Sequence, residues 1–364
     1  MRILHLIPTL SGGGAERQLA YLTKGQAEQG HQVRVAFIRP GTSRLEQGAV
    51  EFHQLSCRNH YDPWLFWQLS RLVKTFRPHL LQSWLYQMDI LGALISRWNG
   101  VPWILRESCS ELSHPPGLKT RLLLWLVSRA RAIVSNSQAG DAYWQTHAPR
   151  VPRFIVQNGL PSAEIQRATP AAGLPWDNGS PLILYVGRLF RDQTGGKRVN
   201  SILNALAELS KTHRVQAAIC GDGSELPNLR ELSRKLRIED SVHFLGQQPQ
   251  SQVWSLLKRA DLFITLSAHE GCPNSLLEAM AAGCPAVVSD IPAHRAILNE
   301  QSALFVDPDN PAETARLMSQ LLMQPDRGAE LAQAAVKKAE SLSVQSMVKN
   351  WQTVYDSLGL SQGF

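Results

Sequence analysis

The stretch from Phe263 to Asp290 constrains the fold of this chain more than any other, because it reads as strand, loop, helix and strand in direct succession. Two short apolar runs, at 262–266 and 286–288, have the length and composition of buried strands. Between them, 274–282 is rich in strong helix formers and is closed by Gly283, a typical helix stop signal. The pattern predicts two buried strands joined by a helix.

The beginning of this helix has the composition of an anion-binding site. Asn274 is expected to be its N-cap, since asparagine is favoured at that position. The backbone N–H groups of Ser275, Leu276 and Leu277 would then have no partner within the helix. Free amides at a helix N-terminus favour a phosphate or another anion.

Two carboxylates flank this helix start. Glu270 lies in the loop before the helix, and Glu278 lies on its second turn. A carboxylate can accept hydrogen bonds from neighbouring hydroxyls, as on a ribose or a hexose, so the pair suits a ligand that carries both sugar and phosphate. Taken singly, each has a structural alternative: Glu270 as a solvated loop charge and Glu278 as an exposed helix residue.

The segment HEGCPNSLLEAMAAGCPAVVSD, with seven residues between Glu270 and Glu278, resembles the signature of glycosyltransferase family 4. These are retaining, nucleotide-sugar-dependent enzymes of the GT-B fold. The resemblance implies an α/β chain with two Rossmann-like, doubly wound parallel-sheet domains that face each other across a cleft. It also implies that Glu270 contacts the transferred sugar, that Glu278 binds the nucleotide ribose, and that the helix start at Asn274, Ser275 and Leu276 receives the donor diphosphate.

Length and alternation agree with two domains. A chain of 364 residues is long enough for two cores, and strands alternate with helices along it, as in parallel sheets wrapped by helices. Ala, Pro, Gly and Asn collect without periodicity in 162–179, so we expect an N-terminal acceptor-binding domain over 1–165 and a C-terminal nucleotide-sugar-binding domain over 166–345. The resemblance implies that the last helix, within 346–364, crosses back to the first domain.

A glycine-rich turn follows the first expected strand, in the segment PTLSGGGAERQ. Glycines between a strand and a helix let backbone amides approach a ligand phosphate, although they also occur in plain turns. A dinucleotide fingerprint is not complete here, since G-x-G-x-x-G is absent. In the family that the chain resembles, this loop closes on the donor, which makes Gly13 and Gly14 our donor-side candidates.

The second half of the chain supplies further candidates. After the expected strand 182–186, the resemblance implies an Arg and a Lys that neutralise the donor diphosphate, and Arg188 and Lys197 take these places over a longer loop than is usual. Two cations facing two phosphates is sound chemistry. Gly223 lies in a Gly-Asp-Gly turn before a helix, and Gly246 ends a strand where the family holds the nucleotide base through backbone groups.

One element of the family pattern is missing, and one motif of another architecture is present. Related enzymes carry a histidine near the transferred sugar, but the corresponding segment here reads ILRESCSE, and His114 lies in a turn-like HPP sequence. Asp307-Pro308-Asp309 spells D-x-D, yet it stands in a proline-rich turn after a strand, so we interpret it as structural. We predict no metal site and no cofactor beyond the donor substrate.

Charge and tryptophan are concentrated in the first half. The net charge is +7, and residues 1–165 hold 18 Lys and Arg against 10 Asp and Glu, together with seven of the ten tryptophans. This predicts contact with an anionic surface, such as that of a membrane, or with an anionic acceptor, the alternative being core tryptophans and scattered surface arginines. The helix expected at 64–76, within the segment 64–77, leaves the same choice open between a packed helix and an interfacial one. No recognition-helix, RNP or zinc-finger pattern indicates nucleic acid.

The cysteines and the hydropathy of the chain indicate the cellular compartment in which the protein works. Five cysteines, without metal-type spacing, indicate a reducing, cytoplasmic setting, and no apolar run approaches the roughly 20 residues of a membrane span. We therefore expect a protein of the cytoplasm, or of the cytoplasmic face of the inner membrane.

These observations and the resemblance together predict a retaining hexosyltransferase. The expected reaction moves a sugar from a UDP-linked donor to a lipid-linked glycan for cell-envelope polysaccharide, without a metal ion. Two alternatives stay open: a nucleotide-sugar epimerase of GT-B shape, which would convert the donor by itself, and a non-catalytic subunit, which would bind nucleotide without releasing sugar.

Overall fold

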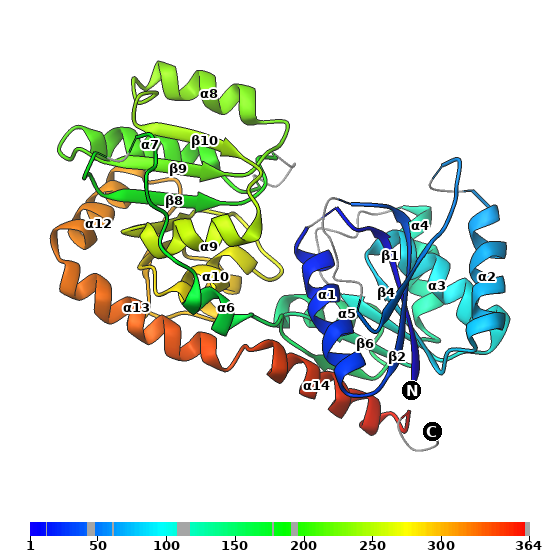
Figure 1. The fold of residues 1–364 in the computed structure, drawn as a ribbon. Coiled ribbons are helices and arrows are strands. Elements are labelled where there is room, and N and C mark those ends of the chain that lie inside the picture. Colours follow the sequence, from blue (N-terminus) through cyan, green and yellow to red (C-terminus); the bar gives the residue numbers. More distant parts are fainter. Residues whose placement is uncertain are drawn as a thin grey trace. The chain divides into compact units, whose positions relative to one another are not determined.

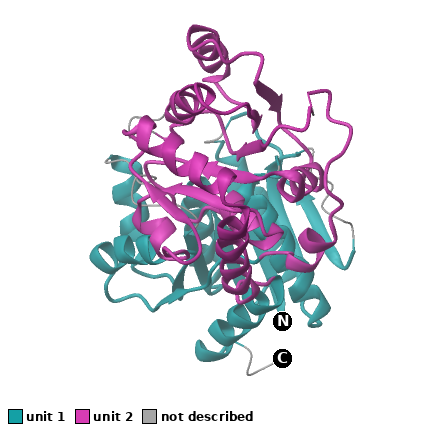
Figure 2. Ribbon diagram, turned by 90° about the vertical axis from the view of Figure 1, so that its left-hand side faces the viewer, with its two compact units in different colours: residues 1–159, 344–364 teal, residues 160–343 magenta. Residues whose placement is uncertain are grey.

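Every described strand pairs in one of two parallel sheets. This computed structural model describes residues 1–11, 13–41, 48–59, 62–107, 117–176, 178–190 and 196–360. The chain forms two compact units, unit 1 with residues 1–159 and 344–364 and unit 2 with residues 160–343 (Figures 1 and 2). One sheet has seven strands and the other six, and helices wrap both, which confirms the predicted class of two doubly wound α/β domains.

The sheet of unit 1 has the strand order β3-β2-β1-β4-β5-β6-β7. Its strands are β1 (Arg2–Thr9), β2 (Gln32–Arg39), β3 (Val50–Gln54), β4 (Leu80–Trp84), β5 (Trp103–Glu107), β6 (Ala132–Ser135) and β7 (Arg153–Ile155). From β1 the chain builds outward to β3 and then returns to place β4 on the other side of β1. Ligands of open α/β sheets bind where the order reverses in this way, beyond the carboxyl ends of the two central strands.

Helices cover both faces of this sheet. They are α1 (Gly14–Glu28), α2 (Trp64–Phe76), α3 (Tyr86–Asn99), α4 (Leu118–Val127), α5 (Gln138–His147) and α14 (Val344–Ser357). Successive side chains of a strand point to opposite faces. Accordingly Leu4 and Leu6 of β1 belong to a core with α2 to α5, whereas Ile3 and Ile7 belong to a second core with α1 and α14.

The last helix, α14, completes unit 1 through a buried polar network. The Tyr355 hydroxyl accepts a hydrogen bond from Gln26 Nε2 at 2.7 Å and donates one to Gln82 Oε1 at 2.9 Å. Gln26 Oε1 in turn accepts from His5 Nε2 at 2.8 Å. Burial lowers the pKa of His5 to about 4, so its ring stays neutral at pH 7. The network joins residues from the two ends of the chain.

The sheet of unit 2 has the order β10-β9-β8-β11-β12-β13, and its order reverses between β8 and β11. Its strands are β8 (Leu182–Val186), β9 (Gln216–Cys220), β10 (Val242–Gly246), β11 (Leu262–Thr265), β12 (Ala286–Ser289) and β13 (Leu304–Val306). Its helices are α6 (Ser162–Arg167), α7 (Val199–Ser210), α8 (Leu226–Lys235), α9 (Gln250–Arg259), α10 (Asn274–Ala282), α11 (Pro292–Arg295), α12 (Pro311–Met323) and α13 (Pro325–Glu340).

The central sequence segment folds as predicted, with one correction. The two apolar runs are the paired strands β11 and β12, and α10 occupies 274–282 and ends at Gly283 with a φ of 72°, a conformation that favours glycine. Asn274, however, is the first helical residue, and the N-cap is Pro273. The N-cap prediction for Asn274 is therefore wrong, because the turn before the helix ends, and the helix begins, one residue earlier than expected.

No helix in the described parts of the chain combines the length and the hydropathy that crossing a bilayer requires.

We expect Trp351→Ala to destabilise the protein strongly. The Trp351 side chain is fully buried in α14 and lies 5.6 Å from the buried guanidinium of Arg106, measured to the ring centroid. Truncating a buried tryptophan costs about 3–5 kcal/mol. Urea denaturation followed by circular dichroism measures the loss. Trp64→Ala, at an exposed tryptophan, is the control and should change the free energy of unfolding by about 0.5 kcal/mol or less. Equal effects at both positions would contradict the placement of α14.

Candidate active site

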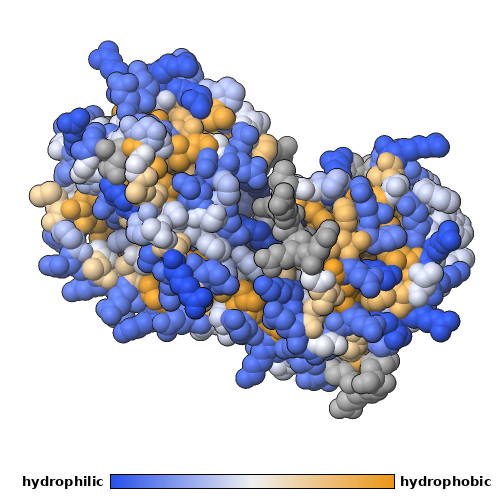
Figure 3. Space-filling model, viewed as in Figure 1, coloured by the Kyte–Doolittle hydropathy of each residue, from blue (hydrophilic) through white to orange (hydrophobic). Residues whose placement is uncertain are grey.

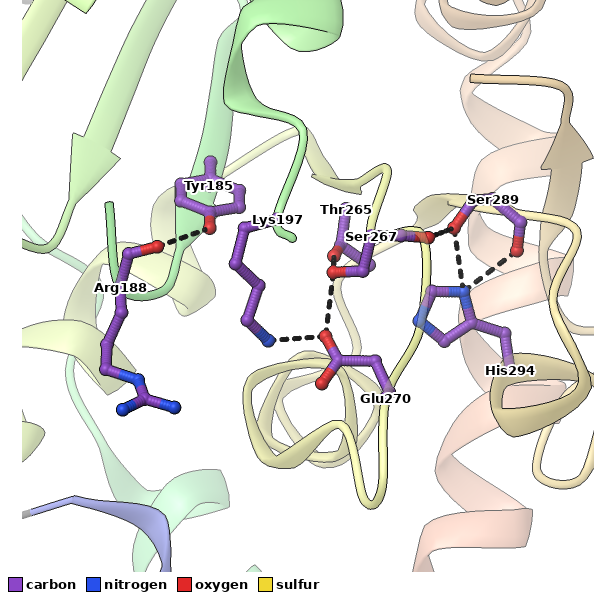
Figure 4. A network of polar contacts seen from close by, with 8 residues as sticks. All are labelled: Tyr185, Arg188, Lys197, Thr265, Ser267, Glu270, Ser289 and His294. Carbon is purple, nitrogen blue, oxygen red and sulfur yellow. Dashed lines mark hydrogen bonds and ion pairs between the residues drawn. The ribbon is translucent and has the colours of Figure 1, made fainter. Parts of the chain in front are cut away.

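Two loops meet where the strand order of unit 2 reverses. One follows β8 and leads to α7, and the other follows β11 and leads to α10. The amide of Ala268 donates to the Gly196 carbonyl at 3.0 Å, and Lys197 Nζ lies 2.5 Å from Glu270 Oε1 (Figure 4). The structure thus brings together the lysine and the first glutamate that the sequence singles out.

The Glu270 carboxylate is held through one of its oxygens. Oε1 accepts hydrogen bonds from Lys197 Nζ and, at 2.7 Å, from the Ser267 hydroxyl. The side chain is only 10 % exposed, so its charge depends on these donors for compensation. Oε2 makes no hydrogen bond to any residue that the structure describes, and it remains available to a ligand hydroxyl.

A series of hydrogen bonds from Ser289 and His294 holds Ser267 in place (Figure 4). The Ser289 hydroxyl donates to the Ser267 carbonyl at 2.6 Å, and His294 Nδ1 donates to the Ser289 carbonyl at 2.8 Å. His294 is fully buried, and burial lowers the pKa of its ring, which is therefore neutral at pH 7. Its Nε2 has no partner among the described residues, so an acceptor lies unused beside the Glu270 loop.

The side chain of Arg188 is exposed at the end of β8. Its carbonyl accepts a hydrogen bond of 3.5 Å from the Tyr185 hydroxyl, and its guanidinium points to the same side as the Lys197 ammonium (Figure 4). Burial, and secondarily the Glu270 charge, raises the pKa of Tyr185, which stays a neutral donor. Two cationic side chains therefore point the same way from the loop after β8.

The start of α10 presents fewer free amides than predicted. Leu277 N donates to the Pro273 carbonyl at 3.0 Å, so its amide is already used and the expectation of three free amides is wrong. The amides of Ser275 and Leu276 donate to no described residue. These two N–H groups keep the capacity to bind an anion. The difference follows from the N-cap position, because the first intrahelical bond goes to the N-cap carbonyl.

Glu278 is buried on α10, at 3 % exposure. Gln250 Nε2 of α9 donates to its Oε1 at 3.3 Å. The alternative that Glu278 is an exposed helix charge is therefore wrong. A buried carboxylate on the helix that follows β11 is a costly feature, which suits a residue whose role is to bind.

The strand ends around the site approach each other closely because they carry glycines. Gly221 N donates to the Gly246 carbonyl at 2.8 Å, and a Cβ added to Gly221 would lie 1.8 Å from the Gly187 carbonyl oxygen. A Cβ at Gly223 would likewise lie 2.4 Å from the Leu189 carbonyl oxygen. The candidates Gly223 and Gly246 both stand at the carboxyl edge of the sheet, but only Gly223 lies where a side chain would collide with the backbone, since a Cβ at Gly246 would meet no atom within 4 Å.

In unit 1, the candidates Gly13 and Gly14 begin α1, directly after β1. Gly13 is the N-cap, with a φ of −71°, and Gly14 is the first helical residue. Gly12 lies outside the described residues. Across the reversal of this sheet, Leu85 after β4 has a φ of 69°, which is strained for a leucine. Such strain is typical of positions that serve binding.

The structure also bears on the segment ILRESCSE with its neighbour His114, on the D-x-D motif and on the grouping of metal ligands. Residues 108–116, with His114, lie outside the described part of the chain. Glu107 is buried and accepts a hydrogen bond from Trp144 Nε1 at 2.8 Å. Asp309 of the D-x-D motif pairs with Arg198 at 2.8 Å, and its amide donates to Asp307. Among residues of described position, no three His, Cys, Asp or Glu side chains are grouped as metal ligands would be.

Two family models match the chain on either side of the predicted boundary. The model of "Glycosyltransferase Family 4" matches residues 12–164, and that of "Glycosyl transferases group 1" matches residues 167–341. Together they cover both units up to α14. The chain belongs to glycosyltransferase family 4.

Individual relatives agree with this assignment. A glycogen synthase of Mycobacterium tuberculosis is 24 % identical over 97 % of this chain and 92 % of its own length. The lipopolysaccharide core biosynthesis glycosyltransferase LpsD of Rhizobium meliloti is 25 % identical over 84 % of each chain. Among solved structures, Anabaena HepE in complex with UDP-glucose has a TM-score of 0.85 at 19 % identity, over 98 % of this chain and all of the other. This chain therefore has the GT-B fold.

Sequence reasoning missed the residues that support Glu270 in this family member. Ser267, Ser289 and His294 are unremarkable in the sequence, yet Ser267 and Ser289 stand at the carboxyl ends of neighbouring strands. That position was a usable signal, because the ends of parallel strands meet at one edge of the sheet. The unused nitrogen of His294 could be found only in the structure.

We expect Gly221→Ala to be far more destabilising than Gly246→Ala. Both glycines have positive φ, of 146° and 67°, but only Gly221 faces a carbonyl where the methyl group would lie. Alanine at Gly246 meets no atom and adds only backbone strain, of about 1–2 kcal/mol. Thermal and urea unfolding of the two variants provides the comparison. Equal losses would contradict the close approach of the loops after β8 and β9.

Proposed function

We propose that this glycosyltransferase moves a sugar from a UDP-linked donor to a lipid-linked acceptor, with retention of configuration. The observation that carries the proposal is the Lys197–Glu270 pair across the reversal point of unit 2. It brings a phosphate-binding cation and a sugar-binding carboxylate within 2.5 Å of each other, in front of a helix N-terminus. A nucleotide-diphospho-sugar carries phosphates that a cation can bind next to a sugar whose hydroxyls a carboxylate can bind.

The donor diphosphate would bind between the loop after β8 and the start of α10. Arg188 and Lys197 would supply two positive charges, and the amides of Ser275 and Leu276 would donate two hydrogen bonds. These groups would also stabilise the charge that develops on the leaving diphosphate, which is an electrostatic role. Asn274, as the first helical residue, would lie beside the same phosphates.

The two glutamates would bind the two sugars of the donor. Glu270 would use Oε2 to orient the transferred sugar, and its negative charge would favour the positive charge developing at the anomeric carbon. Glu278 would accept hydrogen bonds from the ribose hydroxyls. The backbone at Gly223 and Gly246 would approach the base, and Gly13 and Gly14 of unit 1 would close on the donor.

The proposed lipid-linked acceptor and UDP carrier are supported by the names of the relatives and by the composition of the chain. Relatives of this chain act in lipopolysaccharide core biosynthesis by name, and the similar HepE structure contains UDP-glucose. The first 165 residues are basic and rich in tryptophan. The described cysteines are free thiols, in keeping with the reducing interior of a cell. We propose that the protein works at the cytoplasmic face of a membrane, on glycans for the cell envelope.

Replacement of Glu270 or Arg188 should nearly abolish transfer while leaving the protein folded. We expect Glu270→Gln and Arg188→Ala each to lower kcat by about 100-fold or more, since each removes charge stabilisation of the transition state. The measurement is release of the nucleoside diphosphate (UDP, GDP or ADP) from a panel of UDP-, GDP- and ADP-sugars, with a membrane extract as source of acceptor. Circular dichroism verifies folding.

Arg234→Ala, at an exposed arginine of α8, is the matched control and should keep full activity. Near-normal transfer by the Glu270 or the Arg188 variant would refute the role proposed for that residue.

Transfer should also survive EDTA. The proposed site neutralises the diphosphate with two cationic side chains and two amides, so chelation is expected to change the rate less than about twofold. The assay is UDP release before and after dialysis against EDTA. Strong inhibition that is restored by Mg²⁺ or Mn²⁺ would overturn the metal-free mechanism.

A further inference from the structure

Four tryptophans of unit 1 lie on the surface of three consecutive helices. Trp64 and Trp67 belong to α2, Trp98 to α3 and Trp125 to α4, and their exposed fractions are 60, 56, 62 and 53 %. Tryptophan is large and apolar, and a soluble protein gains stability by burying it. Four side chains of this type exposed by more than half require an explanation.

These side chains form one continuous patch. The rings of Trp67 and Trp98 lie 6.5 Å apart, and Phe66 contacts both, at 5.5 and 5.9 Å. On the other flank of α3, the guanidinium of Arg97 lies 6.0 Å from the ring of Trp125. The patch therefore runs from α2 over the end of α3 to α4, and we call it the tryptophan patch (Trp64, Trp67, Trp98, Leu122 and Trp125).

Helical spacing explains how the same helices reach both the core and the patch. In α2 the residues Leu65, Leu69, Leu72 and Val73 are buried and pack against the sheet. Trp64, Trp67, Arg71 and Lys74 follow at intervals of three or four on the exposed side. In α4, Leu122 and Trp125 repeat this arrangement beside buried Leu123 and Leu126. Both α2 and α4 thus carry large apolar side chains on the side that faces away from the core. No other described element of unit 1 buries these side chains.

Basic side chains frame the patch. Arg71 and Lys74 continue the exposed stripe of α2, Arg121 lies on the exposed side of α4, and Arg129 stacks over the Trp125 ring at 5.0 Å. With Arg97 this gives five cations, while the carboxylate of Asp62 accepts a hydrogen bond from the Trp64 amide at 2.9 Å at the start of α2. On the face in view in Figure 3, hydrophilic and hydrophobic residues of unit 1 lie side by side. Interleaved tryptophan and basic residues are the chemistry of a helix that lies in the headgroup region of a bilayer.

We propose that the tryptophan patch docks unit 1 on a bilayer that contains anionic lipids. The indole rings enter the headgroup region, where their apolar bodies are buried and their N–H groups stay hydrated. The five surrounding cations bind lipid phosphates, each contributing about 1 kcal/mol at an anionic surface. Docking does not depend on the proposed sugar transfer, although it would hold the protein beside a lipid-linked acceptor.

Sedimentation with lipid vesicles tests the proposal on the full-length protein. We expect wild type to bind vesicles of phosphatidylcholine with phosphatidylglycerol at least about tenfold more tightly than vesicles of phosphatidylcholine alone. The triple variant Trp67→Ser/Trp98→Ser/Trp125→Ser should lose at least about tenfold in vesicle affinity. Arg71→Gln/Lys74→Gln/Arg121→Gln should lose a similar factor, on the anionic vesicles only.

Matched controls come from exposed residues of unit 2. Met323 is 70 % exposed, and Met323→Ser removes an exposed apolar side chain that lies outside the patch. Arg234→Gln/Lys235→Gln/Lys337→Gln removes three exposed cations from α8 and α13. Both controls should bind vesicles like wild type. Circular dichroism and thermal unfolding verify that all variants fold.

Several results would overturn the proposal. They are equal binding of wild type to both vesicle types, no binding to either, or undiminished binding of both triple variants. Sedimentation velocity gives a further one: a wild-type dimer that the tryptophan variant dissociates would show that a second copy of the chain covers the patch.

Release of UDP with donor alone is measured in parallel, because the patch variants should leave it unchanged. Vesicle binding without any transfer would refute the proposed function and leave the docking surface standing.

Discussion

The reversal of strand order between β8 and β11 is the constraint on which the candidate site depends. The two strands pair in parallel, with Ile183 opposite Leu262, so both following loops open at the same edge of the sheet. The chain continues from β8 to one side and from β11 to the other, and no crossover fills the space beyond their ends. Lys197 and Glu270, far apart in the sequence, become neighbours for this reason. The same reversal in unit 1 positions Gly13 and the strained Leu85.

The polar contacts of the site fix the position of the Glu270 carboxylate more than they stabilise the fold. A largely buried ion pair such as Lys197–Glu270 adds little net free energy of folding, because the cost of desolvating both charges offsets their attraction. Its value lies in fixing one carboxylate oxygen with two donors while the other stays free. The Ser267–Ser289–His294 contacts add a rigid backing made of neutral groups, which leaves the charge balance of the site to the two cations, the glutamates and the ligand.

Tryptophan serves two opposite purposes in unit 1. Trp84, Trp144 and Trp351 are buried and anchor the cores on either side of the sheet, and Trp351 ties the end of the chain to its beginning. The tryptophan patch uses the same residue type on the outside, beside arginines and lysines. Among the helical tryptophans, position in the helical repeat separates the two sets, because only residues in phase with the apolar stripe reach the core, whereas Trp84 is buried on strand β4.

The sequence by itself determined the local elements of this protein: the strands and the helix of 262–289, the boundaries of α2, the stop at Gly283 and the family signature at Glu270 and Glu278. These follow from periodicity, helix start and stop residues and spacing, which act over a few residues. The Lys197–Glu270 pair, the support from His294, the burial of Glu278 and the exposure of the four tryptophans were decided only by the tertiary structure. Each depends on which distant segments the sheet order brings together, and no local pattern encodes that order.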